Sequence, residues 1–148
     1  MQPSAGFPAV NETVIRRASP EGADALLALW RASDATASPT DTRDDVLAAI
    51  ANPACIVLVA ESNDTICGSI IGTFDGWRGN MYRLAVHPDH RRQGIARRLL
   101  SEVEAMLTER GARRITALVE SDHPWAVGFW SAVGYHLDER MSRYVRNL

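Results

Sequence analysis

One stretch, residues 84–100, constrains this chain more than any other. It opens with a short apolar run that stops at Pro88, and proline cannot donate a hydrogen bond to a strand ladder. After a polar loop, apolar residues recur with the spacing of one helix face. They are Ile95, Leu99, Leu100, Val103, Met106 and Leu107. The stretch therefore predicts a strand, a tight loop and an amphipathic helix.

The loop that joins this strand to this helix suits an anion. The first backbone N–H groups of a helix have no partner within the helix, and the helix dipole favours negative charge there. Gly94 and Ala96 are small enough to let a phosphate approach the backbone. The sequence has neither a P-loop nor a Gly-x-Gly-x-x-Gly fingerprint. We therefore expect a phosphate or pyrophosphate here, and the alternative is an ordinary turn with solvated arginines.

Length and composition bound the remaining possibilities. A chain of 148 residues with 46% hydrophobic and 23% charged residues is typical of one soluble domain. We expect a flexible tail at residues 1–10 and a single domain at residues 11–148. The net charge of −2 gives no case for a nucleic-acid or membrane partner. Two cysteines that are not expected to pair agree with a cytoplasmic location.

Hydrophobic periodicity and turn residues predict alternating helices and strands. We expect strands at 13–17, 55–61, 65–74, 80–87, 114–119 and 135–145, and helices at 20–31, 42–52, 95–110 and 124–133. The tip at Asn63 and Asp64 predicts a hairpin. The strands at 80–87 and 114–119 should be parallel, because a long helix connects them.

Two motifs carry a resemblance to a known family. Residues 91–96 read Arg-x-x-Gly-x-Ala, and residues 126–135 read Ala-x-x-Phe-Trp-x-x-x-Gly-Tyr. They resemble the coenzyme A loop and the late helix of the GCN5-related N-acetyltransferases (GNAT), most of all small bacterial members of the YpeA type. The resemblance implies an α/β GNAT fold: a mixed sheet of six to seven strands, with splayed central parallel strands, and four helices.

The resemblance also implies acetyl-coenzyme A (acetyl-CoA) as cosubstrate and no metal. The pantetheine arm would pair with the backbone between the splayed strands, and the pyrophosphate would lie on the N–H groups of the loop. The implied cofactor-binding residues are Leu84, Ala85, Val86, Arg91, Arg92, Gln93, Gly94, Ile95, Ala96, Arg97, His123 and Trp130. His87 and His90 flank this loop, and no third metal ligand is spaced near them.

The reaction implied is acetyl transfer to a primary amine, which needs a base for the amine and an acid for the departing thiolate. In the family a tyrosine of the late helix often supplies the acid. Trp130 stands in its place, and an indole cannot donate that proton. Tyr82 and Tyr135 are alternatives, although each also fits a core position. The resemblance thus leaves the acid open.

The base is equally open. Glu120 and Asp122 end the strand at 114–119, and Glu120 is the stronger candidate of the two. His123 stands where the family has an asparagine that contacts pantetheine. It fits that contact, or a base near neutral pH, or a plain helix start.

The acceptor is a small-molecule or peptide amine whose identity the sequence leaves open. Acidic residues at 34–45 favour a cationic acceptor, and Asp75 and Trp77 are the candidate substrate residues. No cysteine lies in a cofactor-facing motif, so we expect direct attack in a ternary complex. The alternative function is a coenzyme A-binding module without catalysis. The last strand is a candidate surface for a homodimer.

Overall fold

The computed structural model describes residues 12–148, so the tail predicted at residues 1–10 lies outside the described part. The described residues form two compact units. One ends at Ala117, and the other is Leu118–Leu148. A single domain over residues 11–148 stays a prediction.

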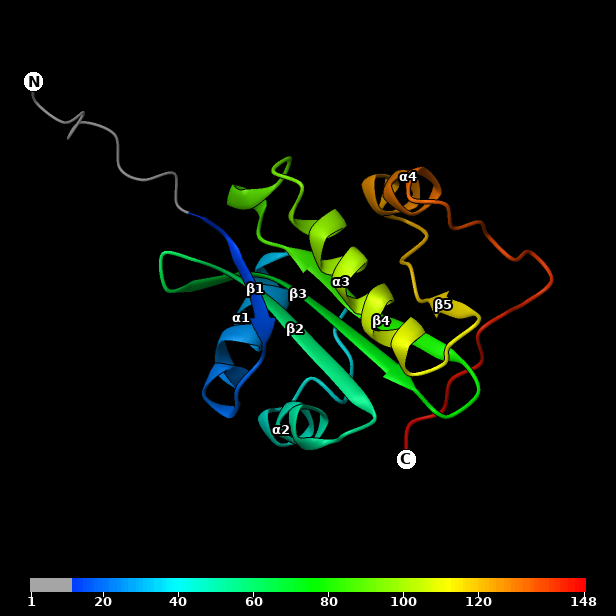
Figure 1. Cartoon of the computed structure of the whole chain (residues 1–148), viewed down its shortest axis with the longest axis horizontal. Helices are drawn as coiled ribbons and strands as arrows, with labels where there is room; N and C mark the ends of the chain where they lie inside the picture. The colour runs from blue at the N-terminus through cyan, green and yellow to red at the C-terminus, as the bar shows by residue number, and fades with distance from the viewer. Residues whose placement is uncertain (1–11) are drawn as a thin grey trace, which may run out of the picture. The chain divides into compact units, whose positions relative to one another are not determined.

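The first unit contains one mixed sheet (Figure 1). Its strands lie in chain order: β1 (Val14–Arg17), β2 (Cys55–Ser62), β3 (Thr65–Phe74), β4 (Gly79–Val86) and β5 (Ile115–Ala117). Neighbours from β1 to β4 are antiparallel, and β5 is parallel to β4. The predicted parallel pair is confirmed, and its cause is the long helix that returns the chain to the same end of the sheet.

The β2–β3 hairpin turns where the sequence predicts. Asn63 and Asp64 both have positive φ, 52° and 60°. Two left-handed residues between paired Ser62 and Thr65 make a type I′ turn, whose twist matches that of the strands. Asparagine and aspartate tolerate this conformation better than other side chains, so the turn fixes the register of the hairpin.

Helices cover both faces of the sheet. The elements are η1 (Pro20–Gly22), α1 (Ala23–Ala32), α2 (Arg43–Ala51), η2 (Pro88–His90) and α3 (Ile95–Glu109), with α4 (Pro124–Ala132) in the second unit. Helix α2 begins as predicted, because Thr42 Oγ1 accepts the Asp45 N–H at 3.1 Å.

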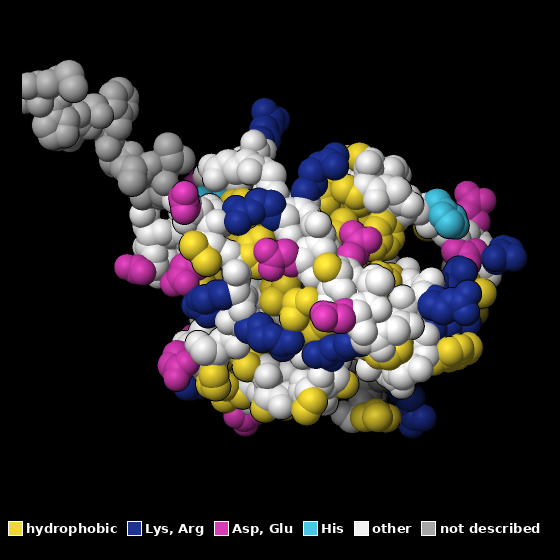
Figure 2. Space-filling model, viewed as in Figure 1, with side chains coloured by type: hydrophobic (Ala, Val, Ile, Leu, Met, Phe, Trp, Pro, Cys, Tyr) yellow, Lys and Arg dark blue, Asp and Glu magenta, His cyan; other side chains and the backbone are white. Residues whose placement is uncertain are grey.

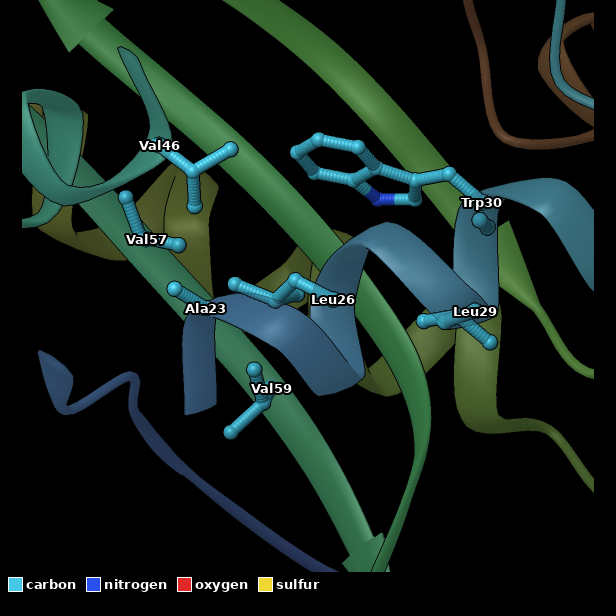
Figure 3. Packing of buried hydrophobic residues seen from close by; sticks show 8 residues of the cluster. Ala23, Leu26, Leu29, Trp30, Val46, Val57 and Val59 are labelled. Atoms are coloured by element: carbon cyan, nitrogen blue, oxygen red, sulfur yellow. The ribbon is translucent and has the colours of Figure 1, made fainter. Parts of the chain in front are cut away.

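The two faces of the sheet pack against different helices. Side chains of α1 and α2 form a buried cluster with Val57, Val59 and Ala85 (Figure 3). The opposite face receives α3, which approaches closely because β3 has glycines there. An ideal Cβ on Gly72 would lie 2.5 Å from Val103 Cγ2. Strand β2 is therefore buried on both faces, which explains its continuous apolar run.

The structure corrects the expected strand number. It gives five strands to residues 12–148, not six to seven. Residues 135–145, predicted as a strand, form none. The apolar residues of this segment are exposed: Leu137, Met141, Tyr144 and Val145. They are spaced by four, three and one residues, so the segment lacks the apolar residue at every second position that a half-buried strand requires. The candidate homodimer surface therefore lacks the strand on which it was based.

Strand β5 is also shorter than predicted. It covers Ile115–Ala117 rather than 114–119. Among residues 12–148, no helix combines the length and the apolar character that crossing a bilayer requires.

Candidate functional site

The start of α3 presents a row of backbone N–H groups. Gly94 is the N-cap, with φ 78° and no side-chain cap, and the first intrahelical bond runs from the Arg98 N–H to the Gly94 carbonyl at 3.1 Å. Arg92 also has positive φ, 65°. Within residues 12–148, no hydrogen bond engages the backbone N–H groups of residues 92–97. These amides are available to an anion.

The charge around these amides is positive. Four arginines lie at 91, 92, 97 and 98, and the first turn of α3 has no acidic residue. Figure 2 shows basic side chains over the loop that leads into α3. Beside the loop lies a hollow of about 540 Å³ whose lining includes Gln93 and Arg98 and also the acidic Glu12 and Asp89. An ideal Cβ on Gly94 would meet no atom within 4 Å, so a ligand can reach the backbone there.

Strand β4 leads from the sheet to this loop, and its far edge is only partly paired. The β4–β5 ladder joins Gly79–Met81 to Ile115–Ala117 and then ends. The structure gives no β5 partner to residues 82–86, which we call the open edge of β4. Strand backbone needs hydrogen-bond partners, so an extended ligand can add there as a further strand. The ladder ends where β5 ends, and the splaying of the two parallel strands stays a prediction.

Three of the predicted cofactor residues, Leu84, Ala85 and Val86, lie on this open edge. Arg91 turns back toward it, and its Nε donates to the Val86 carbonyl at 3.3 Å. The loop and the end of β4 are thereby tied together. The ten predicted cofactor residues from Leu84 to Arg97 thus lie on the end of β4, the loop and the first turn of α3, although the side chains of Ala85, Val86 and Ile95 are buried.

Tyr82 is the first residue of the open edge. It lies opposite Ile71 in the β3–β4 register, and 36% of its surface is exposed. Ile71 packs against the cluster formed with α1 and α2, so Tyr82 lies on that face of the sheet. Its hydroxyl is therefore on the face opposite to α3.

The two predicted substrate residues lie at the other end of β4. Asp75 Oδ1 accepts the N–H groups of Trp77 and Arg78, both at 2.8 Å. These bonds lower the pKa of the Asp75 carboxyl, and the bond from the Arg78 N–H has the larger effect of the two. Trp77 is 72% exposed, and the Arg78 guanidinium lies 4.1 Å from its ring centroid. The structure does not bring this turn together with the α3 loop.

The second unit holds two of the candidate catalytic residues in contact. His123 Nε2 lies 2.6 Å from Glu120 Oε2, and both side chains are about one-third exposed. Asp122 is near, and the three residues bring ligand atoms within 4.8 Å of one another, as a metal ion would require. The sequence predicts no metal, and this stays a prediction.

Trp130 is a packing residue of the second unit. It is 7% exposed, and its ring meets those of Tyr135 and Phe129 edge to face, with centroids 4.8 and 5.5 Å away. Packing in this cluster explains the aromatic side chain at position 130, although an indole cannot donate a proton to the thiolate.

Sequence reasoning missed a buried contact at the bend of β4. Trp30 Nε1 donates to Ser69 Oγ at 2.9 Å, and Ser69 Oγ donates to the Arg83 carbonyl at 2.8 Å. One signal was present: Ser69 is a polar residue within an apolar strand. A buried hydroxyl requires partners, but the sequence does not say which.

Comparison with known proteins agrees with this arrangement. The model of the acetyltransferase (GNAT) family matches residues 23–135. An acetyltransferase of Pectobacterium atrosepticum is 36% identical over 112 residues, which cover 76% of this chain and 79% of that protein. A PaiA N-acetyltransferase of Thermoplasma acidophilum, solved with coenzyme A, superposes with a TM-score of 0.78 at 19% identity. The match covers 86% of this chain and 92% of that one.

A second solved structure has the same fold. An aminoglycoside N-acetyltransferase in complex with coenzyme A has a TM-score of 0.76 at 17% identity, over 96% of this chain and 99% of its own. The fold is thus that of the GNAT acyltransferases. The chain belongs to the GNAT acetyltransferase family and is an acyltransferase. The family that the sequence predicts is therefore confirmed.

Proposed function

We propose that the protein transfers the acetyl group of acetyl-CoA to a primary amine by direct attack within a ternary complex. One observation carries the proposal: within the described residues, the amides of 92–97 have no hydrogen bond, and only residues 87–91 separate them from the open edge of β4. A diphosphate and an extended amide-containing arm are the two parts of coenzyme A that such neighbours suit. The solved GNAT relatives that contain coenzyme A support this assignment.

The diphosphate would bind the amides of residues 92–97. Hydrogen bonds from backbone N–H groups to a charged oxygen are stronger than those between neutral groups. Because the backbone supplies them, the side chains of Arg92 and Gln93 matter less than the conformation of Gly94. Arg97 adds positive charge beside the helix start, which stabilises the same anion.

The pantetheine arm would pair with Leu84 and Val86 on the open edge, which places the thioester beside β4. The neutral amine attacks the carbonyl carbon, and the C–N bond forms while the carbonyl oxygen gains negative charge. The C–S bond then breaks, the carbonyl re-forms, and the sulfur leaves as a thiolate. A backbone N–H that faces the oxygen stabilises the intermediate.

Proton transfer is assigned to the candidate catalytic residues. The Glu120–His123 pair would accept the proton that the amine releases, through Nδ1 of a histidine oriented by the carboxylate. Tyr82, at the start of the open edge, would supply a proton to the thiolate. His123 and Trp130 remain proposed cofactor contacts.

The acceptor is proposed to be a small-molecule or peptide amine with positive charge. The acidic residues between α1 and α2 support a cation, although Asp41 is already paired with Arg83 at 2.7 Å. Asp75 and Trp77 would act as an outer contact for a long acceptor. A cytoplasmic setting, with no metal, nucleic acid or membrane involved, completes the proposal.

A thiol-release assay tests the function. Acetyl-CoA is supplied with a panel of polyamines, aminoglycosides, amino acids and peptides, and free coenzyme A is measured against hydrolysis without acceptor. Sustained release with one class of amine supports the enzyme. Tight coenzyme A binding without release for any amine supports the non-catalytic module, which Trp130 in place of the usual acid favours. Competition by ATP or NAD instead would contradict both.

A further inference from the structure

Strand β4 has one residue more than β3 at a single point. Ser69 pairs with Ala85 and Ile71 pairs with Tyr82, so two residues of β4 lie opposite one residue of β3. Arg83, the first of the two, has φ 54°. A long side chain rarely adopts this left-handed conformation, and such strain persists only where the surroundings hold it. The bulge therefore needs an explanation in its contacts.

The carbonyl of Arg83 is held by a buried hydroxyl. Ser69 is fully buried, and Trp30 is 4% exposed. An indole nitrogen only donates, so Ser69 Oγ must accept from Trp30 at 2.9 Å. The single hydroxyl hydrogen of Ser69 is thereby left for the Arg83 carbonyl, 2.8 Å away. Trp30 thus sets the direction in which Ser69 donates.

The side chain of Arg83 is held as well. Its Nη2 lies 2.7 and 2.8 Å from the two carboxylate oxygens of Asp41, and Nη1 donates to the Thr36 carbonyl at 3.0 Å. The guanidinium also lies over the Trp30 ring, 5.1 Å from its centroid. Both ends of the strained residue are anchored, which is the arrangement expected where a backbone conformation serves a function.

These contacts fix the direction of one amide. In a trans peptide the C=O and the following N–H point opposite ways, and the described peptides are all trans. The Arg83 carbonyl points toward Ser69 on β3, so the Leu84 N–H points away from β3. On that side the β4–β5 ladder has already ended. The Leu84 N–H therefore faces the open edge.

The ladder beyond the bulge agrees with this direction. The His87 N–H donates to the Cys67 carbonyl at 2.8 Å. Because antiparallel ladder bonds alternate, the next residue that bonds toward β3 is Ala85. A flipped peptide at residues 83–84 would instead put the Arg83 oxygen on the open edge and hide the Leu84 N–H. The Ser69 hydrogen bond opposes that flip.

We propose that Ser69 is a positioning residue: its Trp30-directed hydrogen bond to the Arg83 carbonyl aims the Leu84 N–H at the thioester carbonyl of acetyl-CoA. The inference rests on the proposed function, since it needs the thioester on the open edge. As the amine attacks, the carbonyl oxygen takes up negative charge, and a donor fixed beforehand stabilises it without reorganisation. When the C–S bond breaks, the electron pair on that oxygen re-forms the carbonyl and sulfur leaves as thiolate.

The test compares Ser69→Ala with Ser33→Ala. Ser33 is 8% exposed, and its Oγ donates to the Leu29 carbonyl at 2.7 Å. Both variants remove a buried hydroxyl that donates to a backbone carbonyl, but the Ser33 hydroxyl bonds to α1 and not to β4. Trp30→Phe is the second variant, because it keeps the ring and frees the Ser69 hydroxyl to rotate. Circular dichroism and urea unfolding establish that each variant is folded.

The first readout is the backbone amide spectrum of the ¹⁵N-labelled chain. In the natural protein and in Ser33→Ala, acetyl-CoA should shift the Leu84 amide more than coenzyme A does, since only acetyl-CoA carries the carbonyl. In Ser69→Ala that difference should be lost, and in Trp30→Phe it should be reduced. The amides of residues 92–97 should shift equally with both ligands in every variant.

The second readout is kinetic. With an active amine, Ser69→Ala should lower kcat about tenfold or more, a fraction of what deleting an oxyanion donor costs. Its Kd for coenzyme A should stay within about twofold, because coenzyme A has no thioester carbonyl for the Leu84 N–H to bind. Ser33→Ala should change neither value.

The outcomes separate the two claims. If acetyl-CoA shifts residues 92–97 but not Leu84 in the natural protein, the role of Ser69 is refuted and the proposed function stands. If Ser33→Ala lowers kcat as much as Ser69→Ala does, the effect is structural and the inference is likewise refuted. If neither residues 92–97 nor Leu84 respond to either ligand, the proposed function itself fails.

Discussion

Replacement of Gly94 by alanine tests the phosphate site through backbone conformation alone. Gly94 has φ 78°, and an ideal Cβ there would meet no atom within 4 Å. The methyl group therefore clashes with nothing in the protein. Its cost is the strain of a left-handed L-residue, about 1–2 kcal/mol. The helix start can relieve this strain by rotating the backbone that presents the amides.

The other end of α3 provides the control. Gly111 has φ 105°, and its nearest neighbour would be Phe74 Cζ at 3.9 Å. Gly111→Ala carries the same kind of strain on the same helix, far from the proposed diphosphate. Both variants should lose about 1 kcal/mol of unfolding free energy. Only Gly94→Ala should lose a charge-assisted hydrogen bond to the ligand as well, which contributes about 1.5–3 kcal/mol.

That loss corresponds to binding of coenzyme A weakened about 10-fold to 150-fold. Isothermal titration at fixed ionic strength measures Kd, and urea unfolding measures stability. Gly111→Ala should keep Kd within about twofold. Unchanged affinity in Gly94→Ala, or an equal loss in both variants, would refute the assignment of the amides to the diphosphate.

Three further predictions concern stability. Gly72→Ala should lower the unfolding free energy by about 1–3 kcal/mol in urea titrations, because its Cβ would lie 2.5 Å from the stiff Val103 side chain. Thr42→Ala should cost about 1 kcal/mol in the same assay, because it removes the cap of α2. Asp75 should titrate below the ordinary aspartate pKa, chiefly because the Arg78 N–H donates to its charged form. Its stabilising contribution is present above that ordinary value and is lost as the pH falls through the lowered pKa. Asp75→Asn should remove this pH dependence of stability. An NMR-monitored acid titration measures the pKa of Asp75, and an unshifted value would contradict the prediction.

The elements set by local chemistry were predictable from the sequence. Asn63 and Asp64 accept left-handed conformations, so the hairpin turn could be placed correctly. The apolar spacing from Ile95 to Leu107 and the glycine before it placed α3 and its free amides. In each case the determining residues lie within one element and its flanks, where periodicity and turn chemistry act.

Features that depend on distant partners were not predictable. The bend at Arg83 requires Ser69, fourteen residues away, and Trp30, a further 39 residues from Ser69. Nothing in the local sequence of β4 indicates that contact. Residues 135–145 show the opposite error, since β-favouring residues such as Tyr144 and Val145 form no strand there. Strand formation requires a neighbour, and propensity does not supply one.

The extra residue in β4 lies just beyond the last residue pair of its ladder with β5. Up to Met81, every second residue of β4 turns its peptide groups to β5, beginning with the Gly79 N–H at 2.9 Å from the Arg114 carbonyl. The extra residue shifts this alternation by one position. The peptide groups of Leu84 and Val86 therefore face the open edge, as those of residues 83 and 85 would in a regular strand. A regular neighbour strand cannot follow such a change of phase. Deleting a single residue here would restore the regular alternation of peptide groups along β4, and under the proposed function it would turn the Leu84 N–H away from the thioester.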